Sequence, residues 1–249
     1  MCLVLSWVPL AVLGLLRLDV GNGVSQLVFG LAASGPSLAM VVMWLVERSA
    51  RVRLPIVASW TWPLAALILG AAPSGVAALI LNRADVALIG QHAASVAVSV
   101  GGPLAVLGYT MIAGPLSEEF GWRGYVQPLL RQRLGRAATA LTLGSLWGLW
   151  HVPLFFLDGT GQHAMGLFSA KAALFFVALI PLSYSALFVS EYLRGGTLAA
   201  VLIHASYNAA SALLPPFDDG GTWLETCLVL ASAGIVALCW RQRQNRLST

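Results

Sequence analysis

Apolar residues run through this 249-residue chain in long stretches that short polar segments separate. Crossing the roughly 30 Å hydrocarbon core of a membrane takes about 20 mostly apolar residues in a helix. Eight stretches approach or exceed that length, and they cover residues 1–16, 24–46, 56–81, 92–117, 137–156, 172–190, 197–215 and 223–240. The first is short, since sixteen residues of helix reach only about 24 Å. The pattern predicts an all-α fold, a polytopic membrane bundle of about eight transmembrane helices.

The amino-acid composition excludes a soluble protein. Hydrophobic residues make up 58% of the chain and charged residues 10%, whereas soluble domains average roughly 45–50% and about 25%. We therefore expect a single integral membrane domain over residues 1–249, with the lipid bilayer as its partner. The net charge of +4 comes without a basic run interleaved with aromatic residues, so no nucleic-acid partner is expected. The three cysteines lack the spacing of a disulfide framework or a thiolate metal site.

The placement of arginine predicts how the chain is oriented in the membrane. Basic residues follow the second, fourth, sixth and eighth predicted spans, at Arg48, Arg51, Arg53, Arg131, Arg133, Arg136, Arg194, Arg241, Arg243 and Arg246. The opposite loops hold only Arg17, Arg83 and Lys171. By the positive-inside rule both termini are expected in the cytoplasm. The preference for Arg over Lys, with abundant Ala, Gly and Leu, suggests a high-GC bacterium and hence a multi-pass protein of a bacterial inner membrane.

Three Gly-Pro pairs fall inside predicted spans, at Gly35-Pro36, Gly102-Pro103 and Gly114-Pro115. In a soluble helix such pairs are breakers, because proline lacks the backbone N–H and clashes with the preceding turn. In a packed bundle, neighbouring helices satisfy the backbone groups that proline frees. We therefore expect these pairs to lie within spanning helices.

Ionisable side chains occur where the pattern predicts membrane-embedded helix, and such residues mark functional sites by default. They belong to three segments: residues 117–125, which include Glu118, a segment ending at His151, and a segment that begins at His204. Counted along helices from the cytoplasmic ends, Glu118 lies about 20 Å deep, His151 about 22 Å and His204 about 15 Å. Three separate helices therefore bring polar groups to a similar level in the bilayer.

Helical spacing predicts which of these side chains face one another. Glu119 and Arg123 are four residues apart, with the acid first, and can form an ion pair within their helix. Glu118 points about 100° away from Glu119 and is free to face the interior of the bundle. Trp147 lies one turn before His151, on the same face, where its ring can cover the imidazole.

His204 and Asn208 are also four residues apart and share one face of their helix. With Glu118 and His151 they form a set of one carboxylate, two imidazoles and one carboxamide that three helices contribute. Such a set can activate a water molecule.

These motifs resemble the CPBP family, the intramembrane proteases that include type II CAAX prenyl endopeptidases and the bacteriocin-processing or immunity (Abi) proteins. The resemblance rests on Glu-Glu-x-x-x-Arg from Glu118, on an aromatic-x-x-x-His ending at His151 and on His-x-x-x-Asn from His204. It covers about residues 100–210, the protease core. Trp147 stands where the family usually has Phe.

The resemblance implies an intramembrane endopeptidase that hydrolyses a peptide bond. Glu118 would be the general base that deprotonates water, helped by His151. His204 and Asn208 would bind the oxyanion of the tetrahedral intermediate. The substrate would be a peptide or membrane protein, lipidated substrates included.

Three further residues would have supporting roles. Glu119 and Arg123 would hold the Glu-Glu-x-x-x-Arg motif in place, and the ring of Trp147 would form part of the wall of the site.

A metal site is an open alternative at the same residues. Glu118, His151 and His204 make the His₂Glu set that suits catalytic zinc. Against zinc, the sequence has no His-Glu-x-x-His motif and offers no obvious carboxylate to orient either imidazole from behind. We favour water activation without a metal or other cofactor, with zinc as the alternative.

Two other functions compete with proteolysis. A membrane protein with this fold could act as a non-catalytic bacteriocin-immunity or binding module. Intramembrane Glu and His also build transporters and proton relays. Transporters often carry inverted repeats with paired broken helices, and the Glu118 segment has no symmetric counterpart in the sequence.

Overall fold

The computed structural model describes residues 1–46, 56–112 and 114–247, and within those ranges the chain is helical without a β-strand. The first half contains α1 (Cys2–Leu15), α2 (Gly23–Ala33), α3 (Gly35–Val46), α4 (Thr61–Leu81), α5 (Val86–Ser99), α6 (Pro103–Ile112) and α7 (Pro115–Gly121). The second half contains η2 (Trp122–Val126), α8 (Gln127–Arg131), α9 (Arg136–His151), η3 (Val152–Phe156), α10 (Gly161–Met165), α11 (Ala170–Leu187), η4 (Phe188–Tyr192), α12 (Gly196–Leu213) and α13 (Asp219–Leu247). The all-α prediction is therefore confirmed for the described residues.

Three described helices are long and apolar enough to cross a membrane, at Thr61–Leu81, Ala170–Tyr192 and Asp219–Gln242. The number rises to five if each of two bent helix pairs counts as one span. The membrane bundle is thus supported, while the eight-span count stays a prediction. The first predicted span, residues 1–16, forms only a short apolar helix, α1.

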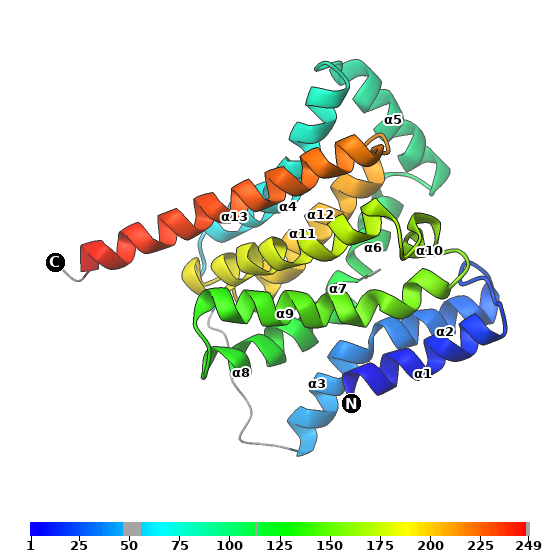
Figure 1. Cartoon of the computed structure of the whole chain (residues 1–249), viewed down its shortest axis with the longest axis horizontal. Helices are drawn as coiled ribbons and strands as arrows, with labels where there is room; N and C mark the ends of the chain where they lie inside the picture. Colours follow the sequence, from blue (N-terminus) through cyan, green and yellow to red (C-terminus); the bar gives the residue numbers. More distant parts are fainter. Residues whose placement is uncertain (47–55, 113, 248–249) are drawn as a thin grey trace.

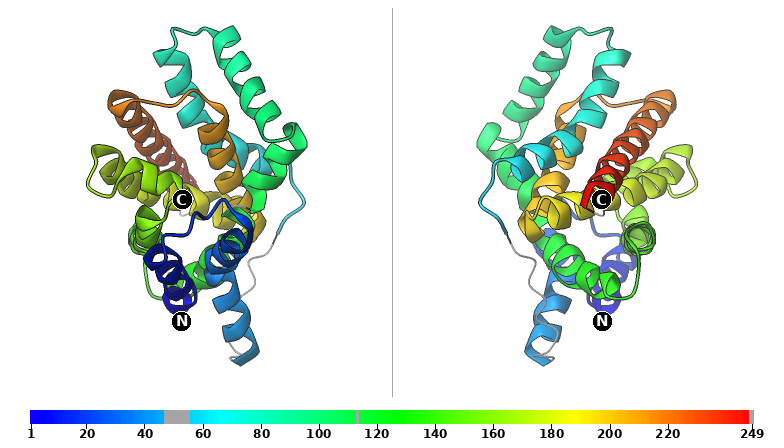
Figure 2. Two further views of the ribbon diagram at one scale, coloured as in Figure 1. Left: turned by 90° about the vertical axis from the view of Figure 1, so that its right-hand side faces the viewer. Right: turned by 90° about the vertical axis from the view of Figure 1, so that its left-hand side faces the viewer.

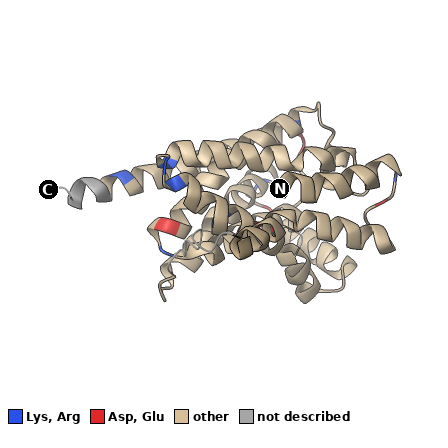
Figure 3. Cartoon of the chain, turned by 90° about the horizontal axis from the view of Figure 1, so that it is seen from below, with Lys and Arg blue, Asp and Glu red and all other residues tan. Residues whose placement is uncertain are grey.

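The basic residues lie unevenly over the molecule. Figure 3 shows Lys and Arg gathered toward the end from which α13 extends. The orientation in the membrane stays a prediction. The predicted cytoplasmic residues Arg48, Arg51 and Arg53 lie outside the described residues.

The Gly-Pro pairs start helices instead of lying inside them, which corrects the expectation of continuous spans. Residues 92–117, predicted as one span, are divided among α5, α6 and α7. Gly102 and Gly114 adopt φ of +102° and +123°, a region that glycine enters readily. The prolines that follow them occupy the first helical turn, where the missing N–H costs nothing. At the remaining pair, α3 begins at Gly35 and is bent by 51° from α2.

Helices α9, α11, α12, α4 and α13 pack side by side around the apolar core (Figures 1 and 2). The closest approaches occur at glycines, as in membrane bundles where small residues let backbones meet. A Cβ on Gly144 of α9 would lie 2.7 Å from the Cα of Ile180 in α11. A Cβ on Gly70 of α4 would fall on the Ile203 carbonyl and the Ser206 hydroxyl of α12. These contacts fix α9 and α12, the two helices that carry the predicted histidines.

An aromatic cluster attaches the last helix to the bundle. Trp240 of α13 lies 5.7 Å from Phe188 and 5.6 Å from Tyr192, ring centroid to ring centroid. The guanidinium of Arg136 lies 4.0 Å above the Trp240 ring. Aromatic pairs and cation–π contacts of this kind each contribute about 0.5–1.5 kcal/mol beyond burial. Helix α13 is thereby held against the start of α9 and the end of α11.

The described part of the chain has two π-helical turns, η2 and η4, and α8, which follows η2, is hydrogen-bonded to η4. The side-chain amide of Gln127 donates to Ser190 Oγ at 3.0 Å and to Glu191 at 3.3 Å. Arg131 forms a 3.0 Å ion pair with the same Glu191. Turns of this kind are frequent near functional sites, and η2 directly follows the predicted Glu-Glu pair.

The glycine packing yields a stability prediction with a control in the same helix. We expect Gly70→Ala to lower the free energy of unfolding by about 1–3 kcal/mol, because the added methyl overpacks the contact between α4 and α12. Gly75→Ala meets open space in α4 and should raise stability slightly, since alanine favours helix over glycine. Thermal and denaturant unfolding of both variants in detergent measure the difference. Equal stability of the two would contradict the close approach.

Candidate active site

A cavity of about 740 Å³ lies between α2, α6, α7, α9, α11 and α12. Its wall includes the four predicted catalytic residues, Glu118 of α7, His151 of α9, and His204 and Asn208 of α12. Apolar side chains such as Phe175 make up much of the remaining surface. The prediction that three helices bring these groups together is therefore confirmed, whereas their chemical roles are not tested by their placement.

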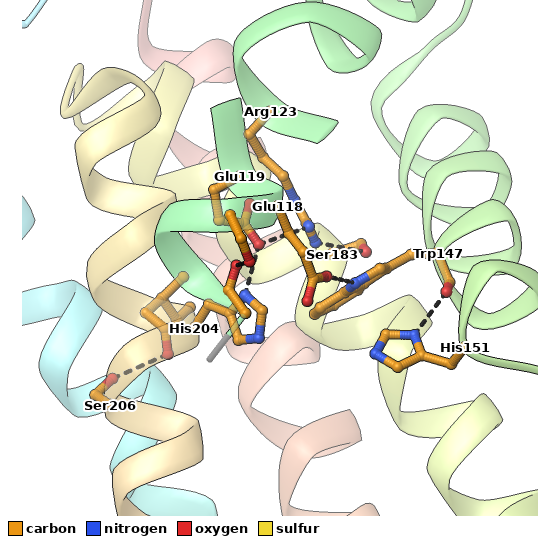
Figure 4. Close-up of polar contacts among 11 residues, drawn as sticks. Glu118, Glu119, Arg123, Trp147, His151, Ser183, His204 and Ser206 are labelled. Atoms are coloured by element: carbon orange, nitrogen blue, oxygen red, sulfur yellow. Dashed lines mark hydrogen bonds and ion pairs between the residues drawn. The ribbon is translucent and has the colours of Figure 1, made fainter. Parts of the chain in front are cut away.

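Glu118 is held at the cavity wall by Trp147. Its carboxylate oxygen Oε2 accepts a 2.7 Å hydrogen bond from the indole Nε1–H of Trp147 (Figure 4). Only 4% of Glu118 is exposed. A charge-assisted bond from a rigid ring fixes the direction of a carboxylate better than solvent does. Helical spacing predicts that Trp147 lies beside His151, but it does not predict the hydrogen bond from Trp147 to Glu118 of α7.

Glu119 has two partners at a single oxygen. Its Oε1 accepts from Arg123 Nη1 at 2.9 Å and from His204 Nδ1 at 2.8 Å. The structure thus confirms the predicted ion pair between Glu119 and Arg123. The hydrogen bond to His204 corrects the expectation that no carboxylate orients either imidazole, because Glu119 of α7 orients His204 of α12. Helical spacing within one segment cannot predict a contact between two helices.

Arg123 of η2 contacts two further helices, α11 and α9. Its Nη2 donates to Ser183 Oγ of α11 at 3.1 Å, and its guanidinium carbon lies 4.3 Å from the centre of the Trp147 ring. Both Arg123 and Ser183 are 1% exposed. Ser183 was missed from the sequence, since a serine in an apolar span carries no signal of its own.

His151 occupies a different part of the wall. Its Nδ1 donates to the backbone carbonyl of Trp147 at 2.8 Å. Its ring packs edge-on against Trp150 and Phe175, at centroid distances of 4.8 and 5.2 Å. The Trp147 ring lies 5.7 Å from His151 and 5.1 Å from His204, and in Figure 4 it stands between the two imidazoles.

The donor set does not fit the zinc alternative. The described part of the chain contains no group of three His, Cys, Asp or Glu side chains that could hold a metal ion. The reason is visible in Figure 4, where the Trp147 indole separates His151 from Glu118 and His204. His204 has the carboxylate partner that metal-binding imidazoles usually have, yet the third ligand is missing.

The Glu119 contacts predict a large effect of its removal on stability. We expect Glu119→Ala to lower the free energy of unfolding by about 3–5 kcal/mol, because Arg123 is left as an uncompensated buried charge. Replacing both residues, as Glu119→Leu with Arg123→Met, should recover much of that loss. Unfolding of the single and double variants in detergent tests this. A single variant as stable as the starting protein would contradict the described pairing.

Comparison with known proteins finds similarity to a family model and to a curated protein. Residues 100–210 match the family model described as type II CAAX prenyl endopeptidase Rce1-like. The curated protein named CAAX prenyl protease 2 from Methanococcus maripaludis is 26% identical over 129 residues, which are 51% of this chain and 48% of that protein. The chain thus aligns with about half the length of this relative. The match to the family model includes Glu118, His151, His204 and Asn208, the four candidate catalytic residues at the cavity wall. Over residues 100–210, the chain is therefore similar to the Rce1-like type II CAAX prenyl endopeptidases.

Proposed function

We propose that this protein is an intramembrane endopeptidase in which Glu118 activates water for the hydrolysis of a peptide bond. The observation that carries the proposal is a buried carboxylate at the wall of a 740 Å³ cavity that it shares with two imidazoles and one carboxamide. A positioned carboxylate that takes a proton from water contributes typically about 10²–10⁴-fold to such a reaction. The match of residues 100–210 to the family model of Rce1-like type II CAAX prenyl endopeptidases supports the same reaction.

The proposed chemistry needs no group beyond the side chains of the cavity. Glu118 takes a proton from water while the water oxygen bonds to the carbonyl carbon of the substrate. The carbonyl electrons move to its oxygen, and the amide N–H of Asn208 stabilises that oxyanion. As the tetrahedral intermediate collapses, the C–N bond breaks and the leaving nitrogen takes the proton from Glu118. A preorganised donor at an oxyanion contributes about 2.7–4 kcal/mol.

The cavity wall supports an apolar substrate. Side chains from α2, α6 and α11 contribute Phe29, Ile112, Phe175 and Leu179 to it, and apolar walls with a few convergent polar groups are typical of sites for hydrophobic ligands. The relative is named a CAAX prenyl protease. We infer that the substrate is a peptide or membrane-protein segment, with a prenylated CAAX-type peptide as the first to test.

The reaction is proposed to proceed without a metal, because His151 is separated from the pair formed by Glu118 and His204. A chelator therefore should leave the rate unchanged. Loss of activity with a zinc chelator, with recovery on added zinc, would contradict this part of the proposal.

Replacement of Glu118 tests the proposed base. We expect Glu118→Gln to lower kcat for a prenylated CAAX-type peptide at least about 100-fold, with an unchanged yield of folded protein. The matched control is Glu225→Gln. Glu225 of α13 is another partly buried carboxylate, bonded to Ser74 Oγ, and it does not line the cavity. Cleavage by purified protein in detergent, followed by mass spectrometry, measures both variants.

The outcomes separate the competing functions. Full activity of Glu118→Gln would exclude Glu118 as the base. A cellular phenotype that survives Glu118→Gln unchanged would favour the non-catalytic binding or immunity module instead.

A further inference from the structure

Two of the candidate spans end side by side, each with an aromatic residue and then an arginine. The span Ala170–Tyr192 is followed by Arg194, and the span Asp219–Gln242 has Trp240 and Arg241 in its last turn. The rings of Tyr192 and Trp240 lie 5.6 Å apart, centroid to centroid. Because Trp and Tyr gather at the depth of the lipid headgroups, this pair of rings places both arginines near the level of the phosphates.

A third helix brings further basic residues to the same pair of rings. Helix α9 begins at Arg136, and the guanidinium of Arg136 lies 4.0 Å above the Trp240 ring. Arg133 lies three residues earlier, between α8 and α9. This is the end of the molecule toward which Lys and Arg gather in Figure 3. The ends of three helices therefore contribute to one basic surface, and we call it the basic rim, which consists of Arg133, Arg136, Arg194 and Arg241.

The positive charge of the basic rim is not balanced by acidic side chains. The carboxylate of η4, Glu191, is already paired with Arg131 at 3.0 Å. Within the described residues, three members of the rim are exposed and form no ion pair, namely Arg133, Arg194 and Arg241. A surface with such an excess of one charge attracts ligands of the opposite charge.

The surface of α13 next to the basic rim is apolar and suits hydrocarbon chains. Ile235 and Leu238 are both more than 60% exposed. Residues three apart are neighbours on a helix surface, so Ile235, Leu238 and Arg241 form a row that leads from the middle of the span to the rim. A ligand that covers this row carries an anionic group joined to hydrocarbon, which is the chemistry of a phospholipid.

We propose that the basic rim binds the phosphate of an anionic phospholipid, whose acyl chains lie along α13. This site is separate from the Glu118 cavity, and it does not depend on the proposed chemistry. Guanidinium groups bind phosphate through paired hydrogen bonds, and each basic residue near an anionic lipid surface strengthens binding about fivefold. The bound lipid joins the start of α9 to the ends of η4 and α13.

Arginines at the ends of spans also direct insertion into the membrane, by the positive-inside rule. That role is complete once the chain has been inserted. Purified protein in an uncharged detergent therefore separates the two roles. A signal for insertion alone leaves the stability of the purified protein independent of the lipid headgroup, whereas a lipid site makes it depend on that headgroup.

The first experiment measures thermal unfolding of the unmodified protein in an uncharged detergent with added palmitoyl-oleoyl phosphatidylglycerol. Near saturation we expect Tm to rise by about 5 °C or more, because the lipid binds the folded state. Phosphatidylcholine with the same acyl chains should raise Tm much less. Equal shifts with the two lipids would overturn the proposal, and so would an equal shift with inorganic phosphate, which lacks the acyl chains.

The second experiment removes charge from the rim, as Arg194→Gln with Arg241→Gln. The matched control is Arg17→Gln with Arg83→Gln, which removes the same charge from exposed arginines in other loops. Arg17 and Arg83 have φ of +51° and +52°, close to the +60° of Arg194, so the backbone strain is matched as well.

We expect the rim variant to raise the concentration of phosphatidylglycerol that gives half of the Tm shift at least about tenfold. The control should change it less than about twofold. Equal effects of the two double variants would show that net charge attracts the lipid, and would overturn the assignment to the rim. The comparison of the two lipids on the unmodified protein decides the proposal even where a variant does not fold.

Discussion

The rest of the site depends on the two hydrogen bonds that a single carboxylate oxygen, Oε1 of Glu119, accepts. The donors are Arg123 of η2 and His204 of α12. Burying one charge in a membrane is costly, and a paired charge with further hydrogen bonds is tolerated. Arg123 makes such a bond to Ser183 of α11. These hydrogen bonds join α7 and η2 to α11 and α12 and hold the His204 imidazole at the cavity wall.

Trp147 extends this arrangement to the other carboxylate. Its ring lies under the Arg123 guanidinium, its N–H holds Glu118, and its backbone carbonyl holds His151. Because Trp147 is hydrogen-bonded to both Glu118 and His151, it fixes the position of α9 against α7, although Glu118 and His151 themselves share no hydrogen bond in the described structure. A phenylalanine, the residue usual at this position in the family that the sequence resembles, could stack but not donate. The indole thus adds a hydrogen bond to Glu118 that a phenylalanine lacks.

The sequence predicts which residues share the cavity better than it predicts the path of the chain. Depth along each helix places Glu118, His151 and His204 at one level, because that estimate needs only the helical rise. The Glu119–Arg123 pair follows from spacing within one helix. Contacts between helices, such as Glu119 with His204, depend on crossing angles that no single segment encodes. Ser183 is unpredictable for the same reason.

The Gly-Pro pairs show why the helix boundaries were harder to predict. Hydropathy alone reads residues 92–117 as one span, yet glycine before proline allows a sharp change of direction at low cost. At Gly114 that change has a chemical consequence. The chain turns there without a side chain, immediately before the helix that carries Glu118, and a Cβ at this position would lie 3.1 Å from Glu118 Oε1 and 3.2 Å from His204 Cε1. The glycine that divides the predicted helix therefore also lets the backbone lie close to the Glu118 carboxylate and the His204 imidazole. The misplaced helix boundary and the geometry of the site have a common origin.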